Sequence, residues 1–136
     1  MAAGYSGRPL AAKLGLKPGQ RAYASGMPAS VAAEIEAELP GFAFAGEPGE
    51  GLEVAHLFTA SRAELEAQLA RLRPLLAPAG MIWVSWPKKA SRVPTDITED
   101  TVREAASPHG LVDVKVCAVD ETWSGLKLVI RKALRG

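Results

Sequence analysis

Two nearly continuous apolar runs, at residues 52–60 and 81–86, predict buried β-strands near the middle of the chain. Strands covered on both faces of a sheet have this composition. Between the runs, apolar residues recur at helical spacing and follow the sequence Ser61-x-x-Glu64, which is typical of a capping box at a helix start. The pattern predicts a strand, a helix that ends at Pro78-x-Gly80, and a second strand, with one helix face formed by Leu65, Leu69, Leu72 and Leu76.

The flanking segments extend this alternation of strands and helices. Residues 21–25 and 42–44 are short strand candidates, and Val31, Ile35 and Leu39 mark a helix between them. A further helix is expected to start near residues 96–99 and to end by residues 108–110. Residues 111–119 and 126–132 are strands whose short connection predicts an antiparallel hairpin.

This order of elements predicts an α/β fold with a mainly parallel sheet between two helical layers and a C-terminal antiparallel hairpin. We expect residues 1–20 to be a lead-in segment and residues 21–136 to form a single domain.

Composition and charge narrow the function classes. The chain has 136 residues with 16 Lys and Arg against 15 Asp and Glu, so it has no global field that would attract nucleic acid or an anionic membrane. It has no apolar run long enough to span a bilayer and no apolar segment typical of a signal peptide. One cysteine forms no internal disulfide and no zinc cluster, and the cytoplasm is therefore the expected compartment.

Four stretches carry a resemblance to known families. They are GYSGRPLAAKLGLKPG at 4–19, WVSWPKKAS at 83–91, TDITED at 95–100 and CAVDETWSGLKLVIRK at 117–132. On these stretches the chain resembles a bacterial domain-of-unknown-function family, number three-thousand-fifty-two, over nearly its full length. The strand, helix and strand of residues 52–86 also resemble a shortened Rossmann-like fold of S-adenosylmethionine-dependent methyltransferases. The first resemblance implies no established activity.

The methyltransferase resemblance implies a cofactor loop after the first strand, with an acidic residue followed by Gly-x-Gly. Residues 24–29 read Ala-Ser-Gly-Met-Pro-Ala, which has one glycine, no acidic residue and a proline without an amide donor. Ser25 and Gly26 are therefore weak cofactor candidates, and Glu47 is the nearest carboxylate for the ribose hydroxyls. We expect no cofactor, and S-adenosylmethionine stays as the alternative.

Ligands of open α/β sheets bind at the carboxyl ends of the strands, where several polar and aromatic residues of this chain should meet. The strand at 111–119 should run in the same direction as the parallel strands, so that the turn at 120–125 emerges at this rim. Lysines there would hold an anion, serines would donate hydrogen bonds and tryptophans would stack on a planar ligand. The candidate site residues are Ser61, Ser85, Trp86, Lys88, Lys89, Asp120, Trp123 and Ser124.

Each candidate also has a structural interpretation. Lys88 or Lys89 would pair with Asp120 or Glu121, the tryptophans would cover the sheet end, and Ser61 would cap a helix. His56, within an apolar strand, is expected to be packed and hydrogen-bonded, and Cys117 to be a small core residue. No metal site is expected.

The sequence therefore favours a non-catalytic methyltransferase-like domain that binds a small anionic ligand or a protein partner at the rim. An active small-molecule methyltransferase with a divergent cofactor loop is one alternative. A structural homodimer, formed through a strand edge or the apolar hairpin face, is the other.

Overall fold

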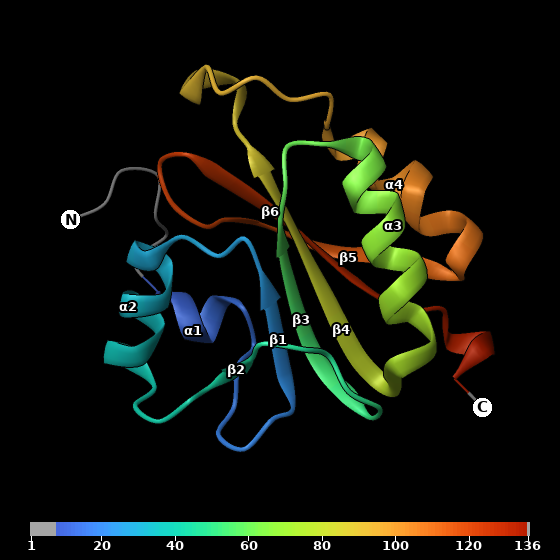
Figure 1. Ribbon diagram of the computed structural model, residues 1–136, viewed down its shortest axis with the longest axis horizontal. Helices are drawn as coiled ribbons and strands as arrows, with labels where there is room; N and C mark the ends of the chain where they lie inside the picture. The colour runs from blue at the N-terminus through green and yellow to red at the C-terminus, as the bar shows by residue number, and fades with distance from the viewer. Residues whose placement is uncertain (1–7, 136) are drawn as a thin grey trace.

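Six strands form one sheet in the order β2-β1-β3-β4-β6-β5 in the computed structural model, which describes residues 8–135. The strands are β1 (Ala22–Ser25), β2 (Phe44–Ala45), β3 (Leu52–Phe58), β4 (Leu76–Pro87), β5 (Leu111–Ala118) and β6 (Trp123–Ile130). The α-helices are α1 (Leu10–Lys13), α2 (Ala29–Glu38), α3 (Arg62–Leu72) and α4 (Glu99–Ala106) (Figure 1).

The sheet is parallel from β2 to β4 and antiparallel where the C-terminal hairpin joins it. β1 pairs in parallel with β2 and β3, and β3 pairs in parallel with β4. β6 lies between β4 and β5 and is antiparallel to both, so β5 runs in the same direction as β4. This topology confirms the predicted mainly parallel α/β sheet with a closing hairpin.

Helices cover both faces of the sheet, in two pairs on opposite sides (Figure 1). One core contains the leucines of α3 with alternate strand residues such as Ala55 and Ile82. The other contains residues of α1 and α2 with the intervening strand residues, including Val54 and Trp83. The alternation of side chains along a strand thus divides the apolar runs between two cores, which explains why these runs are almost continuous.

The segment before Arg21 contributes to the second core. Leu10 and Leu14 are buried, and the indole Nε1 of Trp83 donates a hydrogen bond to the carbonyl oxygen of Leu14 at 2.9 Å. Residues 10–16 therefore pack with the sheet, and residues 1–7 of the expected lead-in lie outside the described residues. The domain boundary after residue 20 stays a prediction.

The end of α3 differs from the sequence-based expectation. The helix ends at Leu72 and is followed by a 3-10 turn over Arg73–Leu75, because Pro74 lacks the amide that a continuing helix needs. Leu76 therefore belongs to β4 and pairs with Leu52. The Pro78-x-Gly80 sequence is a bulge inside β4, where a Cβ at Gly80 would lie 2.8 Å from the Leu52 carbonyl oxygen.

The helix starts are capped largely as expected. The Ser61 hydroxyl accepts a hydrogen bond from the amide of Glu64 at 3.3 Å. The Glu64 carboxylate does not bind the Ser61 amide directly. The Ser61 amide donates to the Thr59 hydroxyl, and the Thr59 hydroxyl donates to the Glu64 carboxylate.

Within residues 8–135, no helix has the length and apolarity that crossing a membrane requires.

Candidate functional site

The carboxyl end of β4 lies beside the hairpin turn, as the sequence predicts. Trp86 is in register with Ser124, and Pro87 is in register with Trp123. Just beyond the strand, the Lys88 amide donates to the Thr122 carbonyl oxygen at 2.7 Å. Two of the stretches that carry the family resemblance are therefore joined along this edge.

The strand register divides the candidate residues between the two faces of the sheet. Trp86 belongs to the core under α3 and α4, and Ser124 shares its face by register. Trp123 packs on the opposite face, where its ring meets that of Phe58 with centroids 5.2 Å apart. A ligand held by Trp86 is thus on the other side of the sheet from Trp123.

Ser85 and His56 form a buried pair on the α1 and α2 side. The Ser85 hydroxyl lies 2.7 Å from Nε2 of His56, and both residues are at most 2% exposed. Burial lowers the pKa of His56 to about 3, so the imidazole is neutral at physiological pH. This confirms that His56 is a packed, hydrogen-bonded histidine, and it gives Ser85 a structural partner.

Asp120 shapes the hairpin turn. Its Oδ1 accepts hydrogen bonds from the amides of Thr122 and Trp123, both at 2.8 Å. This is the arrangement of an Asx turn. Within residues 8–135 no ion pair joins Lys88 or Lys89 to Asp120 or Glu121, so the predicted lysine pairing across the rim is not present.

The residues considered for S-adenosylmethionine each make contacts within the protein. Gly26 has φ +70°, and a Cβ there would lie 2.6 Å from the carbonyl oxygen of Phe58, so the glycine is required by the neighbouring strand. Ser25 accepts a hydrogen bond from Nε2 of Gln68 at 3.3 Å. Glu47 forms an exposed ion pair with Arg71 at 2.6 Å. The residues that the methyltransferase resemblance points to are therefore engaged with the protein itself.

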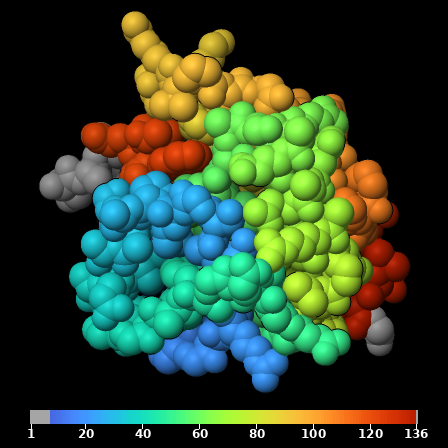
Figure 2. All heavy atoms as spheres, in the orientation of Figure 1, coloured from blue at the N-terminus to red at the C-terminus, as the bar shows by residue number. Residues whose placement is uncertain are grey.

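A cavity of about 610 Å³ opens at the carboxyl end of β4, on the α3 and α4 side. Two predicted site residues, Trp86 and Lys89, line it. The segment after β4 that forms its outer wall projects from the body of the molecule in Figure 2, where it is gold at the top. The full lining consists of Trp86, Pro87, Lys89, Arg92, Val93, Pro94, Thr95, Ile97, Thr98 and Glu99. We call this space the rim cavity.

Arg92 is a cation in the lining of the rim cavity that is absent from the predicted site residues. Its φ of +62° makes it the one non-glycine residue with positive φ among residues 8–135. Such a conformation is costly for a residue with a Cβ. The signal in the sequence was the spacing of Lys88, Lys89 and Arg92, which puts three cations within five residues directly after a strand.

The carboxylate that lines the rim cavity is already paired. Glu99 contacts the guanidinium of Arg103, which also binds Asp100 at 2.9 Å and Asp113 at 3.1 Å. Hydrogen bonds to Asp113, Glu99 and Asp100 raise the pKa of Arg103 further above its usual range. Glu99 is thus committed to a network that joins α4 to β5.

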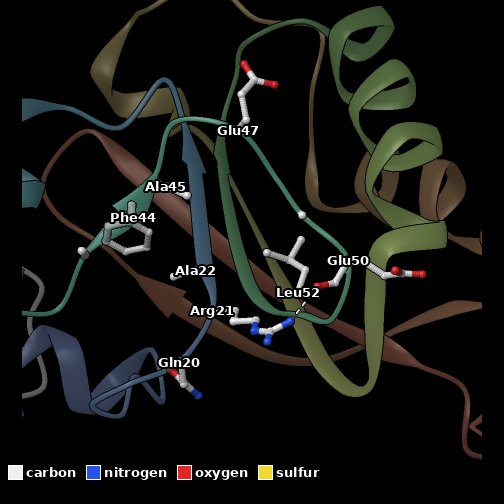
Figure 3. A pocket seen from close by; sticks show the side chains of 10 residues that line it. Gln20, Arg21, Ala22, Phe44, Ala45, Glu47, Glu50 and Leu52 are labelled. Carbon is white, nitrogen blue, oxygen red and sulfur yellow. Dashed lines mark hydrogen bonds between the residues drawn. The ribbon is translucent and has the colours of Figure 1, made fainter.

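A second cavity, of about 430 Å³, lies at the opposite end of the sheet, beside the start of β1 (Figure 3). There the Arg21 guanidinium donates to the Glu50 carbonyl oxygen at 3.0 Å, while the Glu47 side chain extends away from Arg21. Glu47, the carboxylate considered for a cofactor ribose, lines this space, and none of the eight candidate ligand residues at the rim does. In the described part of the chain, His, Cys, Asp and Glu side chains form no group of three that could hold a metal ion.

Cys117 is buried on the hairpin, and burial raises the pKa of its thiol. A raised pKa disfavours the thiolate, which is the nucleophilic form. This agrees with the prediction of a small core residue.

Comparisons with known proteins give a family and a fold. A family model described as "Protein of unknown function (DUF3052)" matches residues 11–132. A search of curated protein sequences finds no match to the chain.

Solved methyltransferase-like structures share the fold at low sequence identity. Fibrillarin from Aeropyrum pernix, with S-adenosyl-L-methionine bound, is 14% identical with a TM-score of 0.54, and the match covers 88% of this chain and 73% of that one. LepI in complex with SAM is 15% identical with a TM-score of 0.52, and the match covers 90% of this chain and 39% of LepI. Magnesium protoporphyrin IX methyltransferase from Synechocystis PCC 6803, with bound SAM, is 14% identical with a TM-score of 0.51, covering 73% of this chain and 52% of that one. The chain thus spans between about two fifths and three quarters of these relatives' length, and the likeness shows a Rossmann-like methyltransferase fold.

Proposed function

The chain belongs to the DUF3052 family, and we propose that it is a non-catalytic methyltransferase-like domain that binds a small anionic ligand in the rim cavity. The observation that carries this proposal is a cavity at the carboxyl end of β4 whose lining contains two cations without an ion pair to any described residue. In open α/β sheets this end of the strands is where ligands bind.

The charge of the rim cavity favours an anion. Lys89 and Arg92 are both exposed and line the cavity, and no ion pair within residues 8–135 involves either side chain. Glu99, the one carboxylate in the lining, contacts the Arg103 guanidinium. An arginine fork beside an ammonium group is a favourable arrangement for phosphate or carboxylate oxygens.

The opposite wall of the cavity is apolar. Trp86 is 8% exposed and Ile97 is 2% exposed, so both contribute surface to the cavity while they pack in the core. Val93, which is 44% exposed, and Pro94 complete the apolar lining. The ligand class that fits is an anionic group attached to a flat or apolar body.

The hydroxyls that line the rim cavity have structural roles. Thr95 donates to the Ala60 carbonyl oxygen at 2.8 Å, and Thr98 caps α4 through the amide of Thr101. His56 and Cys117 do not line the cavity. The wall contains no histidine, cysteine or serine, and its two threonine hydroxyls and the Glu99 carboxylate are engaged within the protein, so the cavity supports binding, and this is why we propose a non-catalytic role.

Phenyl phosphate joins the two features of the proposed ligand and is a suitable probe. We expect Lys89→Ala and Arg92→Gly each to weaken its binding at least tenfold, as measured by isothermal titration calorimetry. A hydrogen bond to a charged group contributes about 1.5–3 kcal/mol, and 1.4 kcal/mol corresponds to a factor of ten. Glycine is chosen at position 92 because it tolerates the positive φ.

The matched control is Lys132→Ala, which removes an exposed lysine from the C-terminal 3-10 turn. It should bind phenyl phosphate as the wild type does. Equal weakening in the control, or unchanged binding in both rim variants, would contradict the proposal.

A structural homodimer is the second candidate, and it rests on β5. This strand is the outermost one on its side of the sheet, and Val112, Val114 and Val116 are 38%, 54% and 55% exposed. A bulge between Asp113 and Lys115 interrupts the strand, and bulges at sheet edges oppose pairing with another strand. A dimer in sedimentation analysis would favour this candidate over ligand binding.

A further inference from the structure

A third cavity, of about 440 Å³, lies on the α1 and α2 side of the sheet, near the amino end of β4. Its walls come from the turn after α1, from the bulge and first residues of β4, and from β6. The lining consists of Gly15, Lys17, Gln20, Glu53, Ala77, Ala79, Gly80, Met81, Lys127 and Val129. It shares no lining residue with the rim cavity.

Lys127 stands at this cavity beside a second lysine. It is in register with Lys115 on the neighbouring strand β5, and like charges directly opposite each other destabilise a sheet. Lys115 is held by a hydrogen bond from its Nζ to the Lys13 carbonyl oxygen at 2.9 Å. Lys127 makes no hydrogen bond or ion pair through its side chain with any residue in 8–135. Burial lowers the pKa of Lys127, and the charge of Lys115 lowers it further. A bound anion would offset the energetic cost of burying the Lys127 ammonium and its repulsion from Lys115.

The remaining lining sets the charge and the polarity of a ligand. Lys17 is exposed on a turn held by a hydrogen bond from its amide to Oε1 of Gln20 at 3.0 Å. Glu53 is the one carboxylate in the lining, and its Oε1 also accepts from the Arg21 amide at 2.8 Å. Two lysines against one carboxylate leave a single net positive charge, which suits a monoanion better than a dianion.

The floor of the cavity is apolar. Met81 is 6% exposed, Val129 is partly buried, and Ala77 and Ala79 complete the surface. A purely inorganic anion would leave this surface in contact with water. A carboxylate that carries a short alkyl chain would cover it while its charged end meets Lys127.

We infer that this cavity is a second binding site, for a short-chain carboxylate, in which Lys127 contacts the carboxylate and Met81 and Val129 contact the alkyl chain. Lys17 adds charge at the entrance. The inference is independent of the proposed function, because it uses a different cavity on the opposite face of the sheet.

Titration of hexanoate into the full chain tests this inference by calorimetry at neutral pH. Lys127→Met should weaken binding at least tenfold, since it removes the charge and keeps a long side chain on β6. Lys17→Met should weaken binding by a smaller factor, and Lys132→Met should bind as the wild type does. Hexanol, which has the same chain without the charge, should bind at least tenfold more weakly than hexanoate.

A second measurement on the wild-type protein does not depend on any variant folding. The side-chain pKa of Lys127, followed by NMR of labelled lysine, should rise when hexanoate saturates the site, while that of Lys132 should stay unchanged. Hexanol binding as tightly as hexanoate, or an unchanged Lys127 pKa under saturation, would overturn the inference. Tighter binding of inorganic phosphate than of hexanoate would overturn the assignment of a carboxylate.

Discussion

Replacement of Trp83 by alanine should lower the free energy of unfolding by about 3–5 kcal/mol, which is the usual cost of truncating a large buried aromatic residue. Trp83 is 1% exposed and lies in the core that joins α1 and α2 to the sheet. Its indole also donates to the Leu14 carbonyl oxygen, so the substitution removes a hydrogen bond together with the packing. Urea denaturation followed by circular dichroism measures the change.

Two further substitutions separate the contributions. Trp83→Phe keeps much of the ring but leaves the Leu14 carbonyl oxygen without its partner, which should cost about 1–3 kcal/mol. Val114→Ala changes a side chain that is 54% exposed and should cost no more than about 0.5 kcal/mol. A loss below about 1 kcal/mol for Trp83→Ala would mean that residues 10–16 do not pack on the sheet as described.

Stability should fall steeply as the pH is lowered from about 6.5 to about 3, because His56 is buried in its neutral form. The pKa of His56 is lowered from its ordinary value of 6.5 to about 3 in the folded protein. Between these values the unfolded chain binds a proton that the folded protein does not, so stability is present above pH 6.5 and is lost as the pH falls. A single group contributes at most about 1.4 kcal/mol per pH unit in this window.

The double variant His56→Leu with Ser85→Ala tests the origin of this pH dependence. It removes both members of the buried hydrogen bond, so that neither side chain is left unpaired, and it should fold with a shallower dependence of stability on pH. His109→Gln, in the 3-10 turn after α4, should leave the slope as it is in the wild type. An equal slope in the double variant and the wild type would assign the acid sensitivity to other groups.

Local signals were sufficient for most of the fold. The apolar runs of β3 and β4 and the spacing of Leu65, Leu69 and Leu72 correspond to elements that the structure contains. The boundary near Leu76 was wrong, because Pro74 ends the helix earlier and the chain forms a bulge before it joins β3. The packing of α1 was also missed, since four residues carry too little periodicity to reveal a buried face.

The candidate site was predicted less completely, for a geometric reason. The sequence indicates which strand ends meet, and Trp86 and Ser124 do lie beside each other. It does not give the register, and a shift by one residue moves a side chain to the other face of the sheet. Only the three-dimensional structure shows that Trp86 and Trp123 lie on opposite faces of the sheet. The same holds for the positive φ of Arg92 and its place in the lining of the rim cavity.

We propose that this methyltransferase-like fold binds its ligand at the rim cavity and does not use the loop after β1 to hold S-adenosylmethionine. The first test is thermal unfolding of the wild-type protein with and without millimolar S-adenosylmethionine. A ligand at 100 times its dissociation constant stabilises a protein by about 2.7 kcal/mol, which raises the midpoint by several degrees in a domain of this size. We expect an unchanged midpoint. A clear upward shift would show that the protein binds S-adenosylmethionine, and would contradict this proposal.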